Sequence, residues 1–284
     1  MKPLFIWAGG KNKMLKHYKS LMPENVSTYC EPFFGGGAMY IHVVNHYNPK
    51  HLIINDINED IVRIYKTIKT DFQSFTILMD EMSKEYLPLD KEGRKEYYYS
   101  LRHKHAYDYA GWDTVKEAAV LYFLMKTGFN GIYQLNINTN NRYGTPSGLL
   151  NQKDKVYEKD IVEWWNKSLQ NTQILSGDWK DSCSYVDDKE NNFVFLDPPY
   201  RGSFTSYGQD FSDVNQIELV DYVKENINTT VFLCNRDIED GFYDNILEDL
   251  KMDKFPVTYT AGRRKKTDAG FEAKPATEVL IRNK

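Results

Sequence analysis

The residues best suited to chemistry form the run Asp197-Pro198-Pro199-Tyr200, directly after the apolar segment 193–196. Two consecutive prolines fix the backbone and cannot extend a ladder of hydrogen bonds, so they hold the run rigidly where a strand ends. The Asp197 carboxylate and the Pro198 carbonyl can then accept hydrogen bonds from a planar aromatic amine and direct its nitrogen toward a methyl donor. Tyr200 can stack on the same ring. The simpler alternative is a Pro-Pro turn in which Asp197 caps a loop or helix.

A second candidate site combines the glycine-rich run 31–37 with Asp56, which lies 19 residues beyond Gly37. A glycine turn after a strand lets the backbone approach a ligand, and a carboxylate at the end of the next strand can bind ribose hydroxyls. A dinucleotide or an adenosyl cofactor would suit this spacing, although residues 35–40 lack the third glycine of the dinucleotide fingerprint. The segment 8–13 likewise lacks the spacing and the Ser or Thr of a P-loop. The alternative is a plain glycine turn with Asp56 as a cap.

Length and composition favour a globular protein with one main core. With 284 residues, 41% of them hydrophobic, the chain can form an α/β core with a smaller insertion. No apolar stretch approaches the roughly 20 residues that span a bilayer, so we expect a soluble, cytoplasmic protein without membrane contact. The cysteines, Cys30, Cys183 and Cys234, have no paired spacing and the histidines are scattered. We therefore expect neither a disulfide nor a metal.

The charge is unevenly distributed along the chain. The formal net charge is −4, which does not favour nucleic-acid binding by the whole surface. Residues 261–284, however, carry seven basic and three acidic groups, a net +4, so the remainder carries −8. Arg263, Arg264, Lys265 and Lys266 are candidate phosphate contacts within this tail. A solvated loop is the simpler explanation of such a run.

The elements that must position these residues follow from the hydrophobic pattern. Short apolar runs that end in small or acidic residues predict buried parallel strands, whose carboxyl ends bind ligands in open α/β sheets. These runs are 28–30, 52–54, 173–175, 193–196 and 231–233, and 278–281 is expected to be a closing strand. Helical patterns at 161–169 and 217–227 lie between them. The alternation predicts an α/β fold with three layers.

The middle of the chain has a different residue pattern. Helical patterns without strands fill most of residues 58–127, and 128–150 combines Asn, Thr and Gly with interleaved apolar residues. We interpret 58–150 as a helical insertion with a hairpin at 128–150. The sheet domain would then comprise residues 1–57 and 151–284.

Taken together, the motifs resemble the Dam family of DNA adenine N6-methyltransferases over nearly the full chain. The order of motifs is the family's: Trp7-Ala8-Gly9-Gly10-Lys11, Glu31 through Gly37, Asn55-Asp56-Ile57-Asn58, Gly128-Phe129-Asn130-Gly131, Asp197-Pro198-Pro199-Tyr200, Phe204-Thr205-Ser206-Tyr207 and Asn235-Arg236-Asp237. No single motif decides the matter, but their shared order does. The resemblance implies a Rossmann-like, S-adenosylmethionine-dependent methyltransferase domain whose helical insertion recognises double-stranded DNA.

The resemblance also implies residue roles. The residues expected to surround S-adenosylmethionine are Trp7, Lys11, Glu31, Phe33, Gly35, Gly37, Asp56, Asp178 and Asp197. Asp197, Pro198, Pro199 and Tyr200 would hold a flipped adenine, and the loop 204–211, which includes Tyr207, would order over the base. The residues expected to contact DNA in the hairpin are Asn130, Ile132, Gln134, Asn136 and Arg142. No metal and no obligate protein partner are implied.

One position departs from the family pattern. Members that methylate GATC have an arginine that reads guanine where this chain has Gln134. Because glutamine prefers a bidentate contact to adenine, a recognition sequence other than GATC is expected. Alternatively, Gln134 is a surface residue without a role in recognition, and Arg142 supplies the guanine contact.

Two other functions are also compatible with these motifs. The acceptor could be cytosine N4 or an RNA base, since related proline-containing motifs serve planar nitrogens generally. The chain could also be a catalytically silent DNA-binding protein on the same scaffold. The intact Asp197, Tyr200 and Asp56 favour an active adenine methyltransferase.

Overall fold

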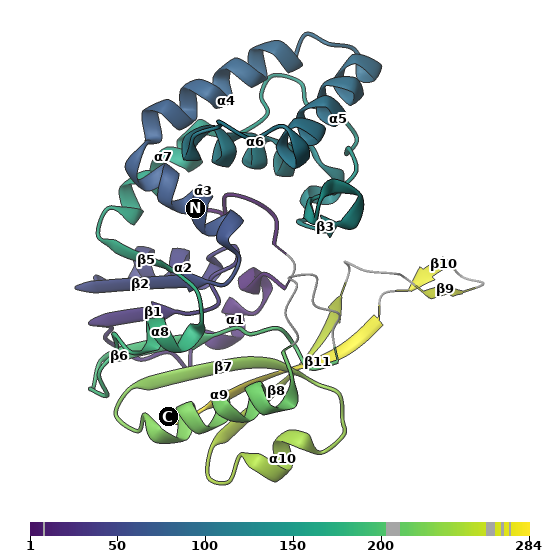
Figure 1. The fold of residues 1–284 in the computed structure, drawn as a ribbon. Coiled ribbons are helices and arrows are strands. Elements are labelled where there is room, and N and C mark those ends of the chain that lie inside the picture. Colours follow the sequence, from purple (N-terminus) through teal and green to yellow (C-terminus); the bar gives the residue numbers. More distant parts are fainter. Residues whose placement is uncertain (8, 203–210, 260–264, 268–269, 273) are drawn as a thin grey trace.

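A computed structural model describes residues 1–7, 9–202, 211–259, 265–267, 270–272 and 274–284, with only the backbone described between 259 and 274. Its centre is a seven-stranded sheet with the order β5-β2-β1-β6-β7-β11-β8 (Figure 1). The strands are β1 (Thr28–Glu31), β2 (His51–Asp56), β5 (Thr172–Ser176), β6 (Asn192–Leu196), β7 (Thr230–Asp237), β8 (Lys251–Tyr259) and β11 (Lys274–Arg282). β1, β2, β5, β6 and β7 pair in parallel, and β11 is antiparallel to both neighbours. The predicted α/β class is confirmed.

Alternate residues of the central strands face two separate cores. On β6, Phe193 and Phe195 join one core, whereas Val194 and Leu196 join the other. The second core is covered by α8 (Trp179–Cys183), α9 (Asp213–Glu225) and α10 (Phe242–Ile246). The first is covered by α1 (Leu15–Tyr18), α2 (Ala38–His46), α3 (Glu59–Thr70) and α7 (Lys159–Leu169). Because both faces are covered, the strands are apolar on both sides, as their sequences indicate.

Four helices lie between β2 and β5 along the chain before α7. After α3 come α4 (Phe72–Tyr86), α5 (Lys91–Tyr107) and α6 (Thr114–Thr127), which gather beyond the sheet in Figure 1. Three of the four begin with a side-chain cap: Asn58, Asp90 and Asp113 each accept a backbone N–H of the first turn. α3 contacts both the sheet strands and α6, so it joins the two parts.

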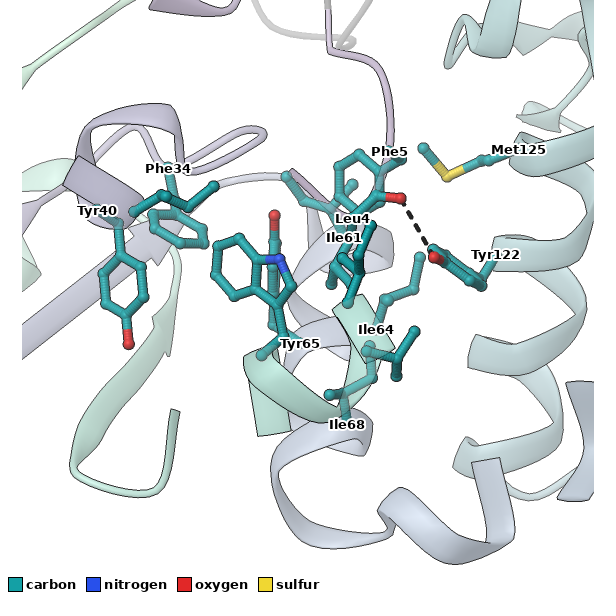
Figure 2. Packing of buried hydrophobic residues seen from close by; sticks show 14 of the residues in the cluster. Leu4, Phe5, Phe34, Tyr40, Ile61, Ile64, Tyr65, Ile68, Tyr122 and Met125 are labelled. Atoms are coloured by element: carbon teal, nitrogen blue, oxygen red, sulfur yellow. Dashed lines mark hydrogen bonds between the residues drawn. The ribbon is translucent and has the colours of Figure 1, made fainter. Parts of the chain in front are cut away.

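The N-terminal segment fills the space between α3 and α6. Figure 2 shows Leu4 and Phe5 against Ile61 and Ile64 of α3 on one side and Tyr122 of α6 on the other. The Tyr122 hydroxyl donates to the Leu4 carbonyl at 3.2 Å. The helices beyond the sheet therefore share one continuous apolar core with it.

Residues 128–150 form a compact turn structure with little regular pairing. It contains η2 (Phe129–Gly131), β3 (Leu135–Asn136), η3 (Ile137–Thr139) and β4 (Arg142–Tyr143), and β3 and β4 pair antiparallel. Asn130, Asn140 and Asn141 have φ of 53°, 55° and 55°, a region that asparagine tolerates well. The Tyr98 hydroxyl of α5 donates to the Thr145 carbonyl at 2.8 Å, which fixes this segment to the helices.

Three strands were not anticipated from the sequence. β8 mixes polar and apolar residues and contains Pro256, which an outer strand such as this one beside β11 tolerates. β9 (Lys265–Thr267) and β10 (Gly270–Glu272) form a separate antiparallel pair. η1 (Lys11–Lys13) precedes α1.

The described helices include none that is both long enough and apolar enough to cross a bilayer. Within the same described residues, no cluster of three or more His, Cys, Asp or Glu side chains could hold a metal ion. The thiols of Cys30, Cys183 and Cys234 are all buried and unlinked.

Candidate active site

The candidate residues converge because the parallel strands end at one edge of the sheet. β1 ends at Glu31, β2 at Asp56 and β6 just before Asp197. The chain order reverses between β1 and β6, since β1 leads to β2 on one side and β6 leads to β7 on the other. A crevice at such a switch point is the usual ligand site of an open α/β sheet.

Lys11 and Asp197 form an ion pair at this edge, in which Lys11 is buried and Asp197 is partly exposed. The Lys11 Nζ lies 2.7 Å from an Asp197 carboxylate oxygen and donates to the Gly9 carbonyl at 2.7 Å. Burial opposes the charge of Lys11, but Asp197 holds the pKa of that ammonium above its ordinary value. Burial raises the pKa of Asp197, and Lys11 opposes this shift. Lys11 therefore stays protonated and favours the ionised carboxylate.

Tyr200 lies beside this pair and is held by a residue that the sequence did not single out. Its ring centre is 4.8 Å from the Lys11 Nζ, and its hydroxyl donates to Glu278 Oε2 at 3.2 Å. Glu278 comes from β11 and is 5% exposed. Burial raises the pKa of the Tyr200 hydroxyl well above its usual value, so it remains a donor. The sequence offered one indication of a role for Glu278, which is an acidic residue at the start of the otherwise apolar segment 278–281.

The glycine turn after β1 packs against Asp56. Asp56 is 9% exposed, and its carboxylate accepts the Gly35 N–H at 2.8 Å and the Asn58 N–H at 2.9 Å. Burial raises the pKa of Asp56 to about 6, although these backbone hydrogen bonds oppose the shift. Gly35 has φ +48°, and a Cβ there would lie 2.5 Å from the Trp7 ring. The turn thus needs glycine both for its backbone and for its close approach to Trp7.

Asn55 ties together the two loops on either side of β2. Its Nδ2 donates to the carbonyls of Pro32 and Gly177, each at 3.0 Å. Gly177 leads into Asp178, an exposed residue whose carboxylate caps α8 by accepting the Lys180 N–H. Asn55 belongs to one of the predicted motifs, but its type and position alone indicated no role for it.

The remaining predicted cofactor residues differ in accessibility. Glu31 is 3% exposed, and its Oε2 already accepts the Tyr29 hydroxyl at 2.7 Å and the Tyr40 N–H at 3.1 Å. Phe33 is half-buried between Trp179, with ring centres 6.4 Å apart, and Phe211 at 5.9 Å. Phe33 therefore offers an aromatic face near the strand ends, whereas Glu31 is directed into the core.

The predicted DNA contacts divide into free and engaged side chains. Asn130, Ile132 and Gln134 are exposed. Asn136 instead caps η3 by accepting the Asn138 N–H. The Arg142 guanidinium pairs with Glu117 of α6 and lies 3.8 Å from the Tyr109 ring centre. Gln134 is thus available to a partner, while Arg142 is engaged within the protein.

The other predicted contacts fall at the edge of the described chain. Tyr207, Arg263 and Arg264 lie outside the described residues, and Lys265 and Lys266 are described only as backbone in β9.

Two cavities lie away from the strand ends. One of about 500 Å³ is lined by residues of α4 and the segment 154–160, and one of about 610 Å³ by residues of α4, α5 and α6. Neither is lined by any candidate site residue. The site is therefore defined by its buried charges and its glycine turn.

A sheet with a glycine turn, buried acids and Asp-Pro-Pro-Tyr at its switch point has the layout of a methyltransferase. The comparison with known families gives the particular class: residues 7–250 match the model of the D12 class N6 adenine-specific DNA methyltransferases. The chain belongs to this family.

Several characterised proteins are similar to this chain. Type II methyltransferase M.MjaIII of Methanocaldococcus jannaschii is 36% identical, over 79% of this chain and 80% of its own. Type II methyltransferase M1.LlaDCHI of Lactococcus lactis subsp. cremoris is 28% identical, over 100% and 95%. The DNA adenine methylase of Haemophilus influenzae is 24% identical, over 78% and 74%.

These similarities confirm the function predicted from the motifs. The protein is an adenine-specific DNA methyltransferase that modifies the N6 amine, and the family implies S-adenosylmethionine as methyl donor. The similarities do not support the alternative acceptors, cytosine N4 and an RNA base, and they do not support a catalytically silent DNA-binding protein.

Proposed function

We propose that the crevice between β1 and β6 is the active site, in which a flipped adenine of double-stranded DNA meets S-adenosylmethionine. The observation that carries this proposal is the pair of buried Lys11 and partly exposed Asp197 beside Tyr200, at the switch point of the sheet. Buried charge that no core requires, placed at the usual ligand edge, is characteristic of a functional site.

The donor side fits an adenosyl group. Gly35 lacks the Cβ that would fill the cradle beside Trp7, and Asp56 presents a buried carboxylate to which ribose hydroxyls can donate. Phe33 offers an aromatic face and Asp178 a second, exposed carboxylate for the purine and its substituents. The bound donor supplies an electrophilic methyl group. The residues proposed to surround the donor are Trp7, Lys11, Glu31, Phe33, Gly35, Gly37, Asp56, Asp178 and Asp197. Among them, Glu31 is engaged with Tyr29 and Tyr40, and Asp197 acts mainly on the acceptor amine.

On the acceptor side, each residue has a distinct task. The Asp197 carboxylate and the Pro198 carbonyl accept hydrogen bonds from the two N6–H groups, so the nitrogen lone pair turns out of the ring plane. Pro199 keeps the run rigid and Tyr200 stacks on the base. Lys11 keeps Asp197 ionised, so that this carboxylate can also accept the proton that the methylated amine releases.

The DNA side is the helical part, residues 58–150, with the segment 128–150 as the base-reading element. Exposed Asn130, Ile132 and Gln134 are the proposed contacts with bases, with Asn136 and Arg142 as the supports that shape the segment. Tyr207 and the basic residues Arg263, Arg264, Lys265 and Lys266 are proposed to contact the target base and the phosphates. The type II names of two relatives favour a role in restriction and modification of cytoplasmic DNA.

Two measurements test the proposed site. Modification-aware sequencing of DNA from expressing cells gives the methylated adenine and its context. A duplex with 2-aminopurine at that adenine should then brighten when the protein binds, because flipping removes the base from its stack. An unchanged fluorescence, with tight binding shown independently, would contradict the flipped-adenine proposal.

A further inference from the structure

Two side-chain amides are fully buried beneath the catalytic run. Gln216 lies on α9 and Asn235 near the end of β7, and both are 0% exposed. The Asn235 Nδ2 donates to Gln216 Oε1 at 2.8 Å, and the Gln216 Nε2 donates to the Pro199 carbonyl at 3.0 Å. Asn235 Oδ1 accepts the Arg201 N–H at 3.1 Å. The two amides therefore connect the backbone groups on either side of Tyr200.

The orientation of this amide pair is fixed by its partners. Asn235 Oδ1 also accepts the Arg236 N–H at 2.8 Å, so that oxygen has two donors and must face them. Its Nδ2 must then face the Gln216 oxygen, which leaves the Gln216 nitrogen toward the Pro199 carbonyl. Turning either amide over would bring like groups together without solvent to compensate, so the chain of hydrogen bonds has one arrangement.

The amide pair contacts the backbone of the catalytic run, whereas other residues hold its side chains. The Arg201 side chain is already held by Asp213, at 2.7 Å, and by Asp240, at 2.8 Å. The Tyr200 hydroxyl is held by Glu278. The peptide groups between Pro199 and Arg201, which set the plane of the Tyr200 ring, are contacted by Gln216 and Asn235 instead.

We propose that Gln216 and Asn235 are positioning residues for the reaction, which fix Tyr200 and the adjoining Asp197-Pro198 acceptor pair in the geometry that methyl transfer needs. This inference rests on the proposed active site. A stacked ring and two hydrogen-bond acceptors must be correct together, and an error of about 1 Å in such an arrangement can cost about 100-fold in rate.

Three substitutions separate the contacts. Gln216→Met removes both hydrogen bonds of the side chain, and Asn235→Asp removes only the donor to Gln216 while its oxygens still accept from Arg201 and Arg236. Gln216→Glu restores a donor to the Pro199 carbonyl only while the new carboxyl is protonated. We expect Gln216→Met to lower kcat by about 10- to 100-fold, with the dissociation constant of S-adenosylmethionine within about twofold of wild type.

The Gln216→Glu variant adds a readout that a merely structural role would not produce. A buried carboxyl is protonated at low pH and ionised as pH rises. Its kcat relative to wild type should therefore fall with increasing pH, whereas the Gln216→Met ratio should stay flat.

Asn283 provides a matched control, away from the crevice. Its Oδ1 accepts the Val231 N–H at 3.1 Å, and its Nδ2 donates to the Thr229 carbonyl at 2.8 Å, at the opposite end of β7 from Asn235. Asn283→Asp therefore makes the same chemical change as Asn235→Asp. Because Asn283 is partly exposed and Asn235 is fully buried, it should lower thermal stability less, and it should leave kcat of the folded protein unchanged.

The outcomes are distinguishable. If Asp197→Ala methylates DNA normally, the proposed active site itself fails. If Asp197→Ala is inactive but Gln216→Met keeps the wild-type kcat, only the positioning role is overturned. Equal losses of kcat in Asn235→Asp and Asn283→Asp would overturn it too, because they would reflect folding alone.

Discussion

The catalytic edge of the sheet and the segment 128–150 are built in opposite ways. At the edge, Lys11 and Asp56 are buried charged groups and Asp197 is partly buried, and each has partners within 3 Å. In 128–150, the side chains proposed to meet DNA are exposed, and β3 and β4 are only two residues long. Buried and partly buried side chains meet at the edge, whereas the segment is joined to the helices through its backbone and through side chains other than those proposed to meet DNA.

This contrast indicates where substitutions can be tolerated. A group at the edge has buried partners that would be left unsatisfied, so its loss affects both the fold and the reaction. An exposed side chain such as Gln134 can change without disturbing the hydrogen bond between its own carbonyl and the Gly144 N–H. Residues at the catalytic edge are thus expected to tolerate few substitutions, whereas exposed residues of 128–150 can change and alter the preferred DNA sequence.

The largest expected effect comes from removing Asp197. Asp197→Ala should reduce methyl transfer at least about 100-fold, as the loss of one preorganised hydrogen-bonding group does elsewhere. Donor affinity should change little, since the carboxylate acts mainly on the acceptor amine. Single-turnover methylation with equilibrium donor titration measures both, and substantial remaining activity would contradict the role. Asp197→Asn serves as the control for the volume of the side chain.

Asp56 tests the donor side of the same edge. Asp56→Ala should weaken S-adenosylmethionine binding about 10- to 100-fold, because ribose hydroxyls lose a charged acceptor. In the wild type, donor affinity should fall as pH drops through about 6, the pKa at which Asp56 becomes protonated. Calorimetric titration between about pH 5 and 8, the range that brackets this pKa, measures the effect. Asp56→Asn is expected to bind weakly and without that pH dependence.

Folding does not explain the expected loss at low pH. Because the pKa of Asp56 is raised in the folded state, its contribution to stability is present at low pH and is lost as pH rises through about 6. Low pH therefore stabilises the fold through protonated Asp56 and at the same time weakens binding of the donor. A dissociation constant that is flat across this range would assign Asp56 a purely structural role.

Gln134 tests the adjustable region. Gln134→Arg should shift the preferred context at one position flanking the target adenine toward guanine, by about tenfold, within the roughly 1–3 kcal/mol typical of a bidentate contact. The wild type should differ from GATC at that position or be relaxed there, and kcat on the preferred site should survive. Sequencing of methylated libraries from both variants measures the preference. Strict GATC specificity that is unaffected by Gln134→Ala would refute this.

The smallest effect concerns the basic run near the C-terminus. Replacing Arg263, Arg264, Lys265 and Lys266 by Gln should weaken duplex binding and reduce the salt slope by about 0.9 for each phosphate that is no longer neutralised. The recognised sequence should be unchanged, since phosphates carry no sequence information. Binding isotherms at several salt concentrations test this. An identical slope would show that the run is only a solvated loop.

The sequence alone predicted most of the sheet and its chemistry. The strands around residues 28–30, 52–54, 193–196 and 231–233 are present because their mostly apolar runs are stable when both faces are buried. The predicted strand at 173–175 is also present, but as β5 it is a partly exposed edge strand. The sequence did not predict β8, because this outer strand mixes polar and apolar residues and contains Pro256. The same pattern is typical of loops.

By itself, the sequence determined the class of fold, the family and the Asp-Pro-Pro-Tyr run, because short motifs and local periodicity carry that information. Only the tertiary structure decided that Lys11 pairs with Asp197, that Glu278 holds Tyr200, and that Gln216 and Asn235 fix its backbone. These contacts join residues from 17 to 186 positions apart. Their pairing follows from strand order and burial, which no local pattern contains, so their roles became visible only once the strand ends had been brought together.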